Sequence, residues 1–470
     1  MSNSEYKITI GIECHVQLKT ATKLFSAVGN DARDAEPNSL ISHIDVGLPG
    51  ALPVLNEKAL ELAVRAAFAL NTEPQKFSKF DRKHYFYPDL PKGYQITQYE
   101  DPIIKGGWVE VDADGQPKRI EITRVHLEED AGKNVHPEGA DYSLVDLNRA
   151  GTPLLEIVSQ PQINSAAEAK AYARELYLLM KYAGVSDVDL YHGNMRFDVN
   201  TSVSKDDGKL GIRTEVKNLN SFRSVENAIN YEVKRQIGLL EKGEQVIQET
   251  RGWDEAKQQT TSQRGKEEAH DYRYMPEPDI PPVELDEQFV ARIKSEMPLL
   301  PPSIREILNK LSISAKVIDD LMEREETTRL VLRQMSDGDE ASARRLVFWT
   351  MQSESEGKAA DATQTKELSD MVEAGELNSN AAQTVFDEMI SSGQPPRQIA
   401  QQKNLLQVSD EGALAAIVAE VLAENAAAAE DVKNGEMKAI GFLTGQVMAK
   451  SRGQANPQLA QKLIKKQLGL

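Results

Sequence analysis

Apolar and polar residues alternate strictly over residues 6–18, which is the two-residue period of a half-buried strand. One face of this predicted strand carries Ile8, Ile10, Ile12, Cys14, Val16 and Leu18. The other face carries Glu13, His15 and Gln17. Successive side chains point to opposite faces of a strand, so we expect the Cys14 thiol in the core. It would then point away from His15 and be a poor nucleophile.

Helical periodicity follows in the same part of the chain. Apolar residues recur at helical spacing over residues 57–71, 166–183 and 221–241. The sequence Asn-Ser-Phe suits the start of the third of these helices, because a serine can cap the first free backbone amides. This mixture of strand and helix patterns predicts a first domain of mixed α and β structure.

Two proline-rich segments, 279–283 and 299–303, mark the exit from this first domain. After them the chain reads as amphipathic helix over 303–311, 316–325 and 329–335. From about residue 357 it becomes rich in Ala, Gln, Glu and Lys. We therefore predict the fold class α+β, with a strand-rich N-terminal domain followed by all-α modules.

Composition narrows the class of protein. The chain has 470 residues, 40% of them apolar, which is enough for two or three domains. It has no run of eighteen apolar residues, so no membrane-spanning helix is expected, and its N-terminus lacks the features of an export or transit sequence. The single cysteine, Cys14, excludes an internal disulfide and a multi-cysteine zinc site. We expect a cytoplasmic protein.

Charge is unevenly distributed along the chain. The formal net charge of −18 argues against general binding of nucleic acid over the whole surface. From residue 437 to the end, however, there is no acidic residue, whereas Lys438, Lys450, Arg452, Lys462, Lys465 and Lys466 are basic. This cationic end suits one polyanion bound at one place. A solvated amphipathic helix explains the same charges, and charge alone does not decide between the two.

Carboxylates occur on several short strand-like segments that are otherwise apolar: GIECHVQL, RVHLEEDAGK, TPLLEIVS and NMRFDVNTS. A buried, unpaired charge costs several kcal/mol, so one such residue needs an explanation and four segments suggest a common one. A convergent site for a hard cation such as magnesium is the economical explanation, because that ion prefers oxygen ligands and substrate phosphates. Glu13 and His15 share one strand face, although a solvated polar face would look the same.

The acids at 128–130 are consecutive, and a charged turn is the alternative to a metal site there. Strand alternation sends Glu128 and Glu129 to opposite faces, so at most one of them reaches a given ion directly. Glu156 stands among leucine, isoleucine and valine, which leaves a salt bridge, with Arg149 as one partner, or a metal. Asp198 is similar, with Arg196 as the competing partner.

Cations and aromatic residues suggest where phosphates would bind. In FDRKHYFYPDLPKGYQ, Arg82 and Lys83 stand among aromatic and proline residues, which suits a rigid wall beside a nucleotide, although the aromatic residues suit a loop packed on the sheet equally well. Glu215 and Lys217 share one strand face, and DYRYMPEPD forms another charged aromatic loop. The sequence has neither G-x-x-x-x-G-K-[ST] nor G-x-G-x-x-G after a strand, and no G-x-S-x-G elbow. If the protein uses ammonia from glutamine, another chain must release it.

These residues carry a resemblance to a known family. The segments GIECHVQLKTATKLFS, VGLPGALPVLN, FDRKHYFYPDLPKGYQITQ, HLEEDAGK, DLNRAGTPLLEIVS, EVKNLNSFRSVENAINYE and DYRYMPEPDIPP are similar to the B subunits of the aspartyl/glutamyl-tRNA amidotransferases, in family order across most of residues 11–282. GFLTGQVMAKSRGQANP resembles the tail domain of the same family, which is related to YqeY proteins.

The resemblance implies a cradle-shaped catalytic domain (1–295), a helical domain (296–405) and a YqeY-like tail that binds tRNA (406–470). It implies a carbon–nitrogen ligase that uses ATP and magnesium to phosphorylate the side-chain carboxylate of Glu-tRNA(Gln) or Asp-tRNA(Asn). Ammonia from an amidase-type A subunit then displaces the phosphate, and a small C subunit completes a heterotrimer. Some members carry a cysteine-rich zinc knob, but residues 26–46 contain no cysteine, so no zinc is expected here. The family more often has Asn in place of His84.

By motif position, the family's metal region falls on Glu13, His15, Glu128, Glu129, Glu156 and Asp198, and sequence does not separate direct ligands from orienting groups. As metal ligands we predict His15, Glu13, Glu129, Glu156 and Asp198. As catalytic residues we predict Glu13, Glu128, Glu129, Lys83 and Lys217, and as phosphate-facing residues Arg82, Lys83 and Lys217. For tRNA we predict Lys438, Lys450, Arg452, Lys462, Lys465 and Lys466. A free-standing ATP-dependent ligase and a non-catalytic tRNA-binding subunit stay open, as does the choice between Glu-tRNA and Asp-tRNA.

Overall fold

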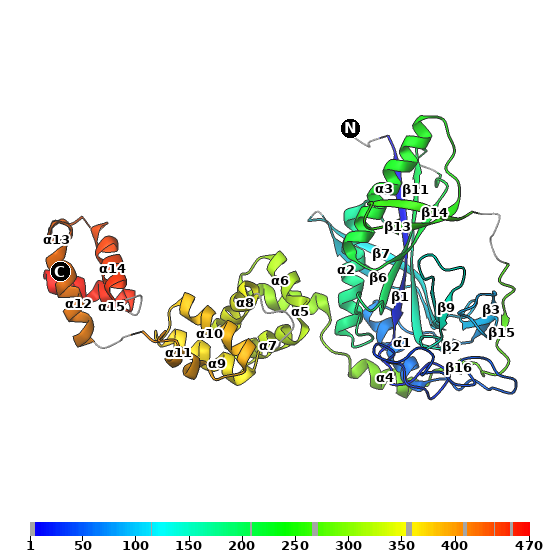
Figure 1. Cartoon of the computed structure of the whole chain (residues 1–470), viewed down its shortest axis with the longest axis horizontal. Helices are drawn as coiled ribbons and strands as arrows, with labels where there is room; N and C mark the ends of the chain where they lie inside the picture. The colour runs from blue at the N-terminus through cyan, green and yellow to red at the C-terminus, as the bar shows by residue number, and fades with distance from the viewer. Residues whose placement is uncertain are drawn as a thin grey trace. The chain divides into compact units, whose positions relative to one another are not determined.

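The structure is a computed structural model that describes residues 5–113, 115–206, 209–265, 271–353, 360–407, 411–436, 438–451 and 455–470. The chain forms two compact units, Met1–Pro301 and Pro302–Leu470. Figure 1 shows that the first unit combines a large sheet with helices and that the second is helical. This confirms the predicted α+β class.

The first unit is built on a nine-stranded sheet with the strand order β14-β13-β12-β11-β1-β10-β7-β5, in which β6 also pairs with β7. The strands are β1 (Lys7–Gln17), β5 (Ile104–Lys105), β6 (Trp108–Asp112), β7 (Pro117–Glu129), β10 (Pro153–Ser159), β11 (Met195–Ser204), β12 (Thr214–Leu219), β13 (Glu249–Asp254) and β14 (Gln259–Gly265). Neighbours are antiparallel except β12 and β13, which pair in parallel. The segment that predicted the first strand therefore lies in the middle of the sheet.

The two faces of β1 differ in burial as the alternation predicted. Ile10, Ile12 and Cys14 are at most 1% exposed and belong to the main hydrophobic core. That core also contains side chains from three helices, α1 (Glu57–Ala69), α2 (Ala166–Tyr182) and α3 (Phe222–Glu241). Burial of so much apolar surface is the main stabilising term of this unit. Glu13 and His15 lie on the other face of β1, away from this core.

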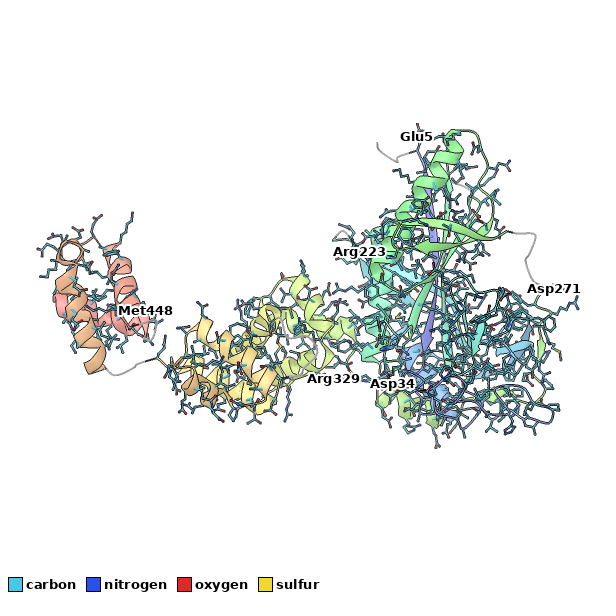
Figure 2. The ribbon with its side chains drawn as sticks, in the orientation of Figure 1. Glu5, Asp34, Arg223, Asp271, Arg329 and Met448 are labelled. Atoms are coloured by element: carbon cyan, nitrogen blue, oxygen red, sulfur yellow. The ribbon has the colours of Figure 1, made fainter. Side chains whose placement is uncertain are left out.

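Each of these helices begins where a capping side chain stands. Asn56, Ser165 and Ser221 accept hydrogen bonds from the backbone amides two or three residues further along, which otherwise have no partner. The Asn-Ser-Phe signal thus gives the start of α3 to within one residue, and Figure 2 marks Arg223 in its first turn. The remaining helix of the unit is α4 (Glu287–Ser295).

A smaller sheet stands beside β7 and completes one wall of the first unit. It has the order β15-β3-β4, with β3 (Asp81–His84), β4 (Tyr94–Thr97) and β15 (Met275–Pro276). The chain leading into β15 begins its described part at Asp271, marked in Figure 2. Two hairpin-sized pairs complete the strands: β2 (Phe77–Ser78) with β16 (Val283–Glu284), and β8 (Lys133–Val135) with β9 (Leu144–Asp146). Side chains of β4 bond the end of β7, so this sheet brings the Arg82–Lys83 segment to the face that carries Glu13 and His15.

The second unit is helical, as its pattern predicted. Its helices are α5 (Pro301–Leu308), followed by a 3-10 turn (Asn309–Leu311), α6 (Ala315–Met322), α7 (Glu325–Ser336), α8 (Glu340–Gln352), α9 (Ala362–Glu373), α10 (Ser379–Ser392), α11 (Pro396–Gln402), α12 (Glu411–Glu424), α13 (Ala426–Lys433), α14 (Ala439–Lys450) and α15 (Pro457–Leu468). Helices α12–α15 share a core of their own around Val418, Leu443 and Ile464. This core supports the predicted tail at 406–470, whose exact boundary stays a prediction. Among the described helices, none is long and apolar enough to cross a membrane.

Candidate active site

Polar side chains from neighbouring strands lie together on one face of the large sheet. The register pairs Glu13 of β1 with Asp198 of β11, and His15 of β1 with Glu156 of β10. Glu156 is paired in turn with His126 of β7. Residues that lie directly opposite one another in an antiparallel pair point to the same face. Sheet register alone therefore assembles residues that are far apart in the sequence.

His15, Glu128 and Glu156 form the centre of this group. Each offers one ligand atom, and these atoms all lie within 4.8 Å of one another. The Nε2 atom of His15 is 3.7 Å from one oxygen of Glu156, and Nδ1 of His126 is 4.0 Å from the other. Glu156 thus stands between two imidazoles, and the predicted candidates His15 and Glu156 are brought together.

The donor atoms fit a divalent cation. Two buried carboxylates supply the oxygen ligands that magnesium prefers. Nδ1 of His15 and Nε2 of His126 are buried and have no hydrogen-bond partner among the described residues. Each ring beside Glu156 therefore has one nitrogen that can still bind a ligand or a water molecule. An imidazole next to a ligating carboxylate commonly orients it. We therefore regard Glu128 and Glu156 as the oxygen donors and His15 as a ligand or an orienting group.

The pKa values of Glu128 and Glu156 are shifted in opposite directions. Burial, helped by the charge of Glu156, raises the pKa of Glu128 to about 6, although Lys83 opposes the shift. Burial would also raise the pKa of Glu156, but the neighbouring His15 outweighs it and lowers that pKa. The pKa of Glu13 is raised by burial and by the charge of Glu156. Such crowding of acidic groups is relieved by a bound cation.

These side chains line a cavity of about 490 Å³. Its walls include the carboxylates Glu13, Glu128, Glu156, Asp198, Glu215 and Glu249, the cations Lys83, Arg124, Arg213 and Lys217, and the rings of Tyr99, Tyr272 and Tyr274. Tyr99 and Tyr274 stack with their ring centroids 4.0 Å apart. A cavity lined by carboxylates, cations and aromatic rings suits a nucleotide phosphate carried by a metal ion.

The pocket cations differ in how much of their charge is already neutralised. Lys217 lies 3.6 Å from Asp198 and 3.5 Å from Glu215. Lys83 lies over the ring of Tyr272, 4.9 Å from its centroid. Burial would lower the pKa of Lys83, but the charges of Glu128 and Glu156 outweigh it and raise that pKa, so Lys83 stays cationic.

Arg124 and Arg213 have no ion-pair partner within the described part of the chain, and Nε of Arg124 also lacks a hydrogen bond there. Arg82, by contrast, does not line the cavity. It is turned toward Glu277, with 2.7 Å between its Nε and the carboxylate. The structure therefore offers Arg124 to an anionic ligand where the sequence had suggested Arg82.

Glu129 lies apart from the metal cluster. It follows Glu128 on β7 and points to the other side, where its carboxylate is 2.5 Å from Nζ of Lys92 and accepts a hydrogen bond of 2.9 Å from the amide of Ile96. Glu128 instead accepts a hydrogen bond of 2.8 Å from the hydroxyl of Thr97 inside the cavity. The structure thus groups Glu128, and not the predicted ligand Glu129, with His15 and Glu156, because two successive strand residues point to opposite faces.

The competing salt-bridge explanations do not apply. Arg149 and Arg196 both pair with Asp130, at 3.3 and 2.9 Å, and not with Glu156 or Asp198. Asp198 accepts a hydrogen bond of 2.8 Å from the backbone amide of Asn218 and faces Lys217. Glu156 and Asp198 therefore both face the cavity, where Asp198 is paired with Lys217.

Sequence reasoning gave no role to His126, Arg124 or Arg213, and it noted Tyr272 and Tyr274 only as part of the charged aromatic loop DYRYMPEPD. A usable signal was present for two of them, because Arg124 and His126 stand four and two residues before Glu128 and share its strand face. Tyr272 and Tyr274 reach the cavity through the pairing of β15 with β3, which are distant in the sequence, and Arg213 reaches it through the pairing of β12 with the nearby β11.

The predicted tRNA-binding cations lie in the second unit. Lys462, Lys465 and Lys466 are exposed on α15 and have no ion-pair partner among the described residues, and neither has Lys438. Lys450 is different, since it pairs with Glu420 at 2.9 Å and Glu424 at 2.5 Å. Arg452 lies outside the described residues.

Comparison with known proteins agrees with this picture. A family model described as the GatB/GatE catalytic domain matches residues 8–291, and one described as the GatB domain matches residues 349–468. The B subunit of the aspartyl/glutamyl-tRNA(Asn/Gln) amidotransferase of Carboxydothermus hydrogenoformans is 43% identical over 99% of both chains. Its counterpart in Moorella thermoacetica is 44% identical over 99% of this chain and all of its own, and that of Listeria monocytogenes is 44% identical over 98% of each. The resemblance is confirmed: the chain belongs to the family of B subunits of aspartyl/glutamyl-tRNA(Asn/Gln) amidotransferases.

Proposed function

We propose that this chain phosphorylates the side-chain carboxylate of glutamate on tRNA(Gln), or of aspartate on tRNA(Asn), and then converts it to the amide. The observation that carries the proposal is the cluster of His15, Glu128 and Glu156 inside a cavity with cationic walls. Family membership supplies the substrate class, because the relatives are named for these two tRNAs. The reaction is that of a glutamine-hydrolysing, ATP-dependent carbon–nitrogen ligase.

The chemistry explains why such a cavity is needed. A carboxylate is a poor acyl donor, since the oxide it would expel is a poor leaving group. When its oxygen attacks the γ-phosphorus of ATP, ADP leaves and an acyl phosphate forms; ammonia then attacks the acyl carbon and phosphate leaves. Bound magnesium would supply charge neutralisation on the phosphates during the transfer. Glu128, Glu156 and His15 would hold it, with Glu13 and Asp198 within the same cavity.

The other pocket residues bind and orient the substrates. Lys83 and Arg124 face the cavity with charge available for phosphate oxygens, and the stacked Tyr99 and Tyr274 offer a flat surface to a base. Attack by ammonia releases a proton, for which the cavity offers the carboxylate of Glu13. Lys217, already beside two carboxylates, orients Asp198 and Glu215 as well as facing the ligand.

The proposal requires partner chains. Neither the sequence nor the cavity offers an activated nucleophile for glutamine hydrolysis, since the only cysteine, Cys14, is buried in the core and burial raises its pKa. We propose an amidase-type A subunit as the source of ammonia and a small C subunit as the third member of a heterotrimer. The tail helices would bind the tRNA.

Reconstitution with these partners and each mischarged tRNA tests the proposal. ATP hydrolysis that requires mischarged tRNA is the expected result. Turnover of ATP with a small carboxylic acid and no tRNA would favour a free-standing ligase instead. ATP turnover that is absent even though tRNA binds would favour a non-catalytic tRNA-binding subunit.

Replacing Arg124 is expected to weaken the binding of ATP. A hydrogen bond to a charged group contributes about 1.5–3 kcal/mol, so Arg124→Met should raise the KM for ATP by about 10- to 100-fold. Arg119→Met is the matched control, because Arg119 is on the same strand but is 63% exposed and lies over Trp108, away from the cavity. Steady-state kinetics of the reconstituted complex measures both. An unchanged KM in Arg124→Met would exclude contact with the nucleotide.

Removing lysines from α15 is expected to reduce the salt dependence of tRNA binding. Each phosphate contact contributes about 0.7–0.9 to the slope of log K against log salt concentration, so Lys465→Ala/Lys466→Ala should lower the slope by about 1.5. Lys450→Ala should change it little, because two glutamates already neutralise Lys450. Filter binding at several salt concentrations measures the slopes. Equal slopes for wild type and the double variant would show that α15 is a solvated helix.

A further inference from the structure

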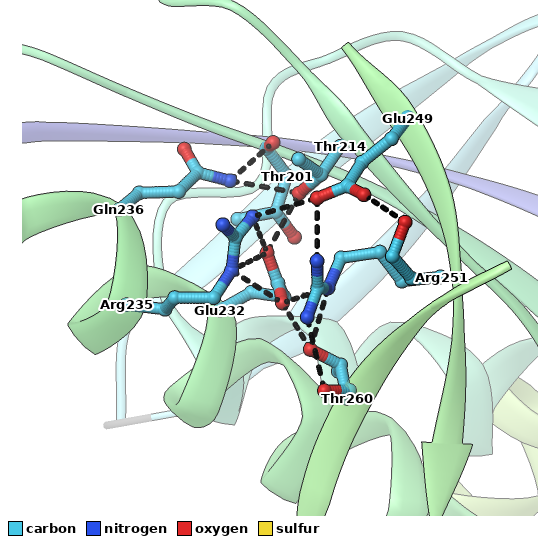
Figure 3. Close-up of polar contacts among 9 residues, drawn as sticks. Thr201, Thr214, Glu232, Arg235, Gln236, Glu249, Arg251 and Thr260 are labelled. Atoms are coloured by element: carbon cyan, nitrogen blue, oxygen red, sulfur yellow. Dashed lines mark hydrogen bonds and ion pairs between the residues drawn. The ribbon is translucent and has the colours of Figure 1, made fainter. Parts of the chain in front are cut away.

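A buried polar cluster lies under α3 (Figure 3), and one of its members, Glu249, also lines the cavity. At its centre is Glu232 of α3, whose side chain is completely buried. The carboxylate accepts hydrogen bonds from the hydroxyls of Thr214 at 2.8 Å and Thr260 at 2.5 Å, and lies 3.1 Å from Nε of Arg251. Thr214, Arg251 and Thr260 belong to β12, β13 and β14. A single side chain thus connects the helix to three strands.

Neighbouring side chains extend the cluster. The amide of Gln236 donates to the carbonyl of Thr201 on β11 at 3.0 Å and to the Thr214 hydroxyl at 2.8 Å. Arg251 also donates to the hydroxyl and the carbonyl of Thr260, at 2.8 and 3.0 Å, and pairs with Glu249. Arg235 pairs with Glu232 at 2.8 Å. The cluster therefore balances two carboxylates against two guanidinium groups.

Such a cluster is a poor way to gain stability. Desolvation of buried ion pairs offsets most of their attraction, and apolar residues of similar volume are often as stable or more so. Its hydrogen bonds, however, are directional and join defined atoms, which apolar contacts do not. The cluster is therefore better explained by the geometry that it specifies.

The parallel pairing of β12 with β13 is the part of the sheet whose geometry most needs such directional contacts. The two strands pair over only three positions, Glu215 with Thr250, Val216 with Arg251 and Lys217 with Gly252. Parallel pairs are slightly less stable per residue than antiparallel ones, and these strands are joined only through the long α3 crossover. A short pair of this kind specifies its register weakly. From one point on α3, Glu232 contacts side chains of both strands, Thr214 of β12 and Arg251 of β13.

The register of β13 on β12 also determines which side chains meet at the cavity wall. The hydroxyl of Thr250 on β13 donates a hydrogen bond of 3.0 Å to Glu215 on β12. Glu215 in turn lies 3.5 Å from Nζ of Lys217. All three residues line the cavity. The smallest slip that keeps the strand faces is two residues, and it would place Gly252 or Gln248 opposite Glu215 and remove the hydroxyl.

We propose that Glu232 is a positioning residue, which fixes the register of β13 on β12 and thereby holds Glu215 and Lys217 in place at the cavity wall. The catalytic consequence rests on the proposed function, whereas the effect on register does not. Glu232 contacts no cavity-lining residue that we assign to the metal, so it acts through the strands.

Two variants test this with the complete heterotrimer. Glu232→Gln removes the charge with little change of shape, and Thr260→Val removes the hydroxyl that joins Glu232 to Arg251. We expect both to raise the KM for Mg·ATP by about fivefold or more with a smaller change in kcat, and to speed amide hydrogen exchange in β13 at residues 249–252. Thr260→Ser keeps the hydroxyl and should restore both values.

The control is Asp45→Asn, which breaks another buried ion pair, with Lys23, away from the cavity. It should lower the melting temperature without changing the KM for Mg·ATP or the exchange in β13. If Glu232→Gln and Thr260→Val leave either the KM or the exchange as in the wild type, the positioning role is excluded and the cluster is structural only. If the wild type does not turn over ATP, the proposed function fails, and unchanged exchange in the variants would still exclude the register role.

Discussion

Glu156→Gln is expected to lower the rate of amide formation on mischarged tRNA by about 100- to 1,000-fold, the range seen when one charge-stabilising group is removed from an active site. Glutamine has nearly the same shape but no negative charge, so it binds a cation more weakly than Glu156 does. It also deprives His15 and His126 of the anion that lies between them at 3.7 and 4.0 Å. The amount of amidated aminoacyl-tRNA formed per minute by the reconstituted complex measures the effect.

Glu110→Gln is the matched control. Glu110 lies on β6 of the same sheet, is about half exposed and pairs with Arg119 outside the cavity. Its loss should leave the rate within about twofold, since exposed pairs of this kind contribute only about 0–1 kcal/mol. Glutamine hydrolysis by the amidase-type partner should continue in both variants. Amide formation at the wild-type rate in Glu156→Gln would remove Glu156 from the reaction.

The largest effect on stability is expected at Glu129. Lys92 is only 6% exposed and its ammonium group is 2.5 Å from the Glu129 carboxylate, so Glu129→Gln leaves a buried charge without its partner. Loss of one member of a buried pair costs about 3–5 kcal/mol. The free energy of unfolding from denaturant titration should fall by that amount in the single variant. It should largely recover in Lys92→Met/Glu129→Gln, because no unpaired charge then remains.

A second pair of variants, Glu129→Gln and Glu128→Gln, tests separately which of the two carboxylates belongs to the metal site. Glu129→Gln should keep the wild-type dependence of ATP turnover on magnesium concentration, measured at a temperature where the variant is folded. Glu128→Gln should need more magnesium, because it loses an oxygen donor of the cluster. A wild-type free energy of unfolding in Glu129→Gln, together with a changed magnesium requirement, would return Glu129 to the metal site as the sequence had suggested.

Local patterns were sufficient for much of the fold. Alternation identified both faces of β1 because one of them packs on helices, and burial of Ile10 and Cys14 follows from it. Helix starts were predictable where a side chain caps the first turn, as Ser221 does for α3. The carboxylates were recognisable as a site because each interrupts an apolar strand.

Partners across the sheet were not predictable from local patterns. Alternation shows that only one of Glu128 and Glu129 reaches the cavity, but the register of β7 decides which. Arg82 and Lys83 are neighbours, yet Arg82 is paired with Glu277 through the β3–β15 contact. Similarly, the basic tail gives no hint that Lys450 is neutralised by glutamates of α12, which precede the basic run in the sequence. Each of these depends on tertiary contacts between distant segments.

Transfer of the γ-phosphoryl group to the aminoacyl side chain tests the central claim most directly. The complex is incubated with γ-labelled ATP and mischarged Glu-tRNA(Gln) or Asp-tRNA(Asn), without glutamine or ammonia, and the label attached to tRNA is counted. We predict label on at least one of these tRNAs with the wild type and with Glu110→Gln, and none above background with Glu156→Gln. Equal labelling by Glu156→Gln, or no labelling of either tRNA by an active wild-type complex, would contradict a phosphoryl-transfer site at His15, Glu128 and Glu156.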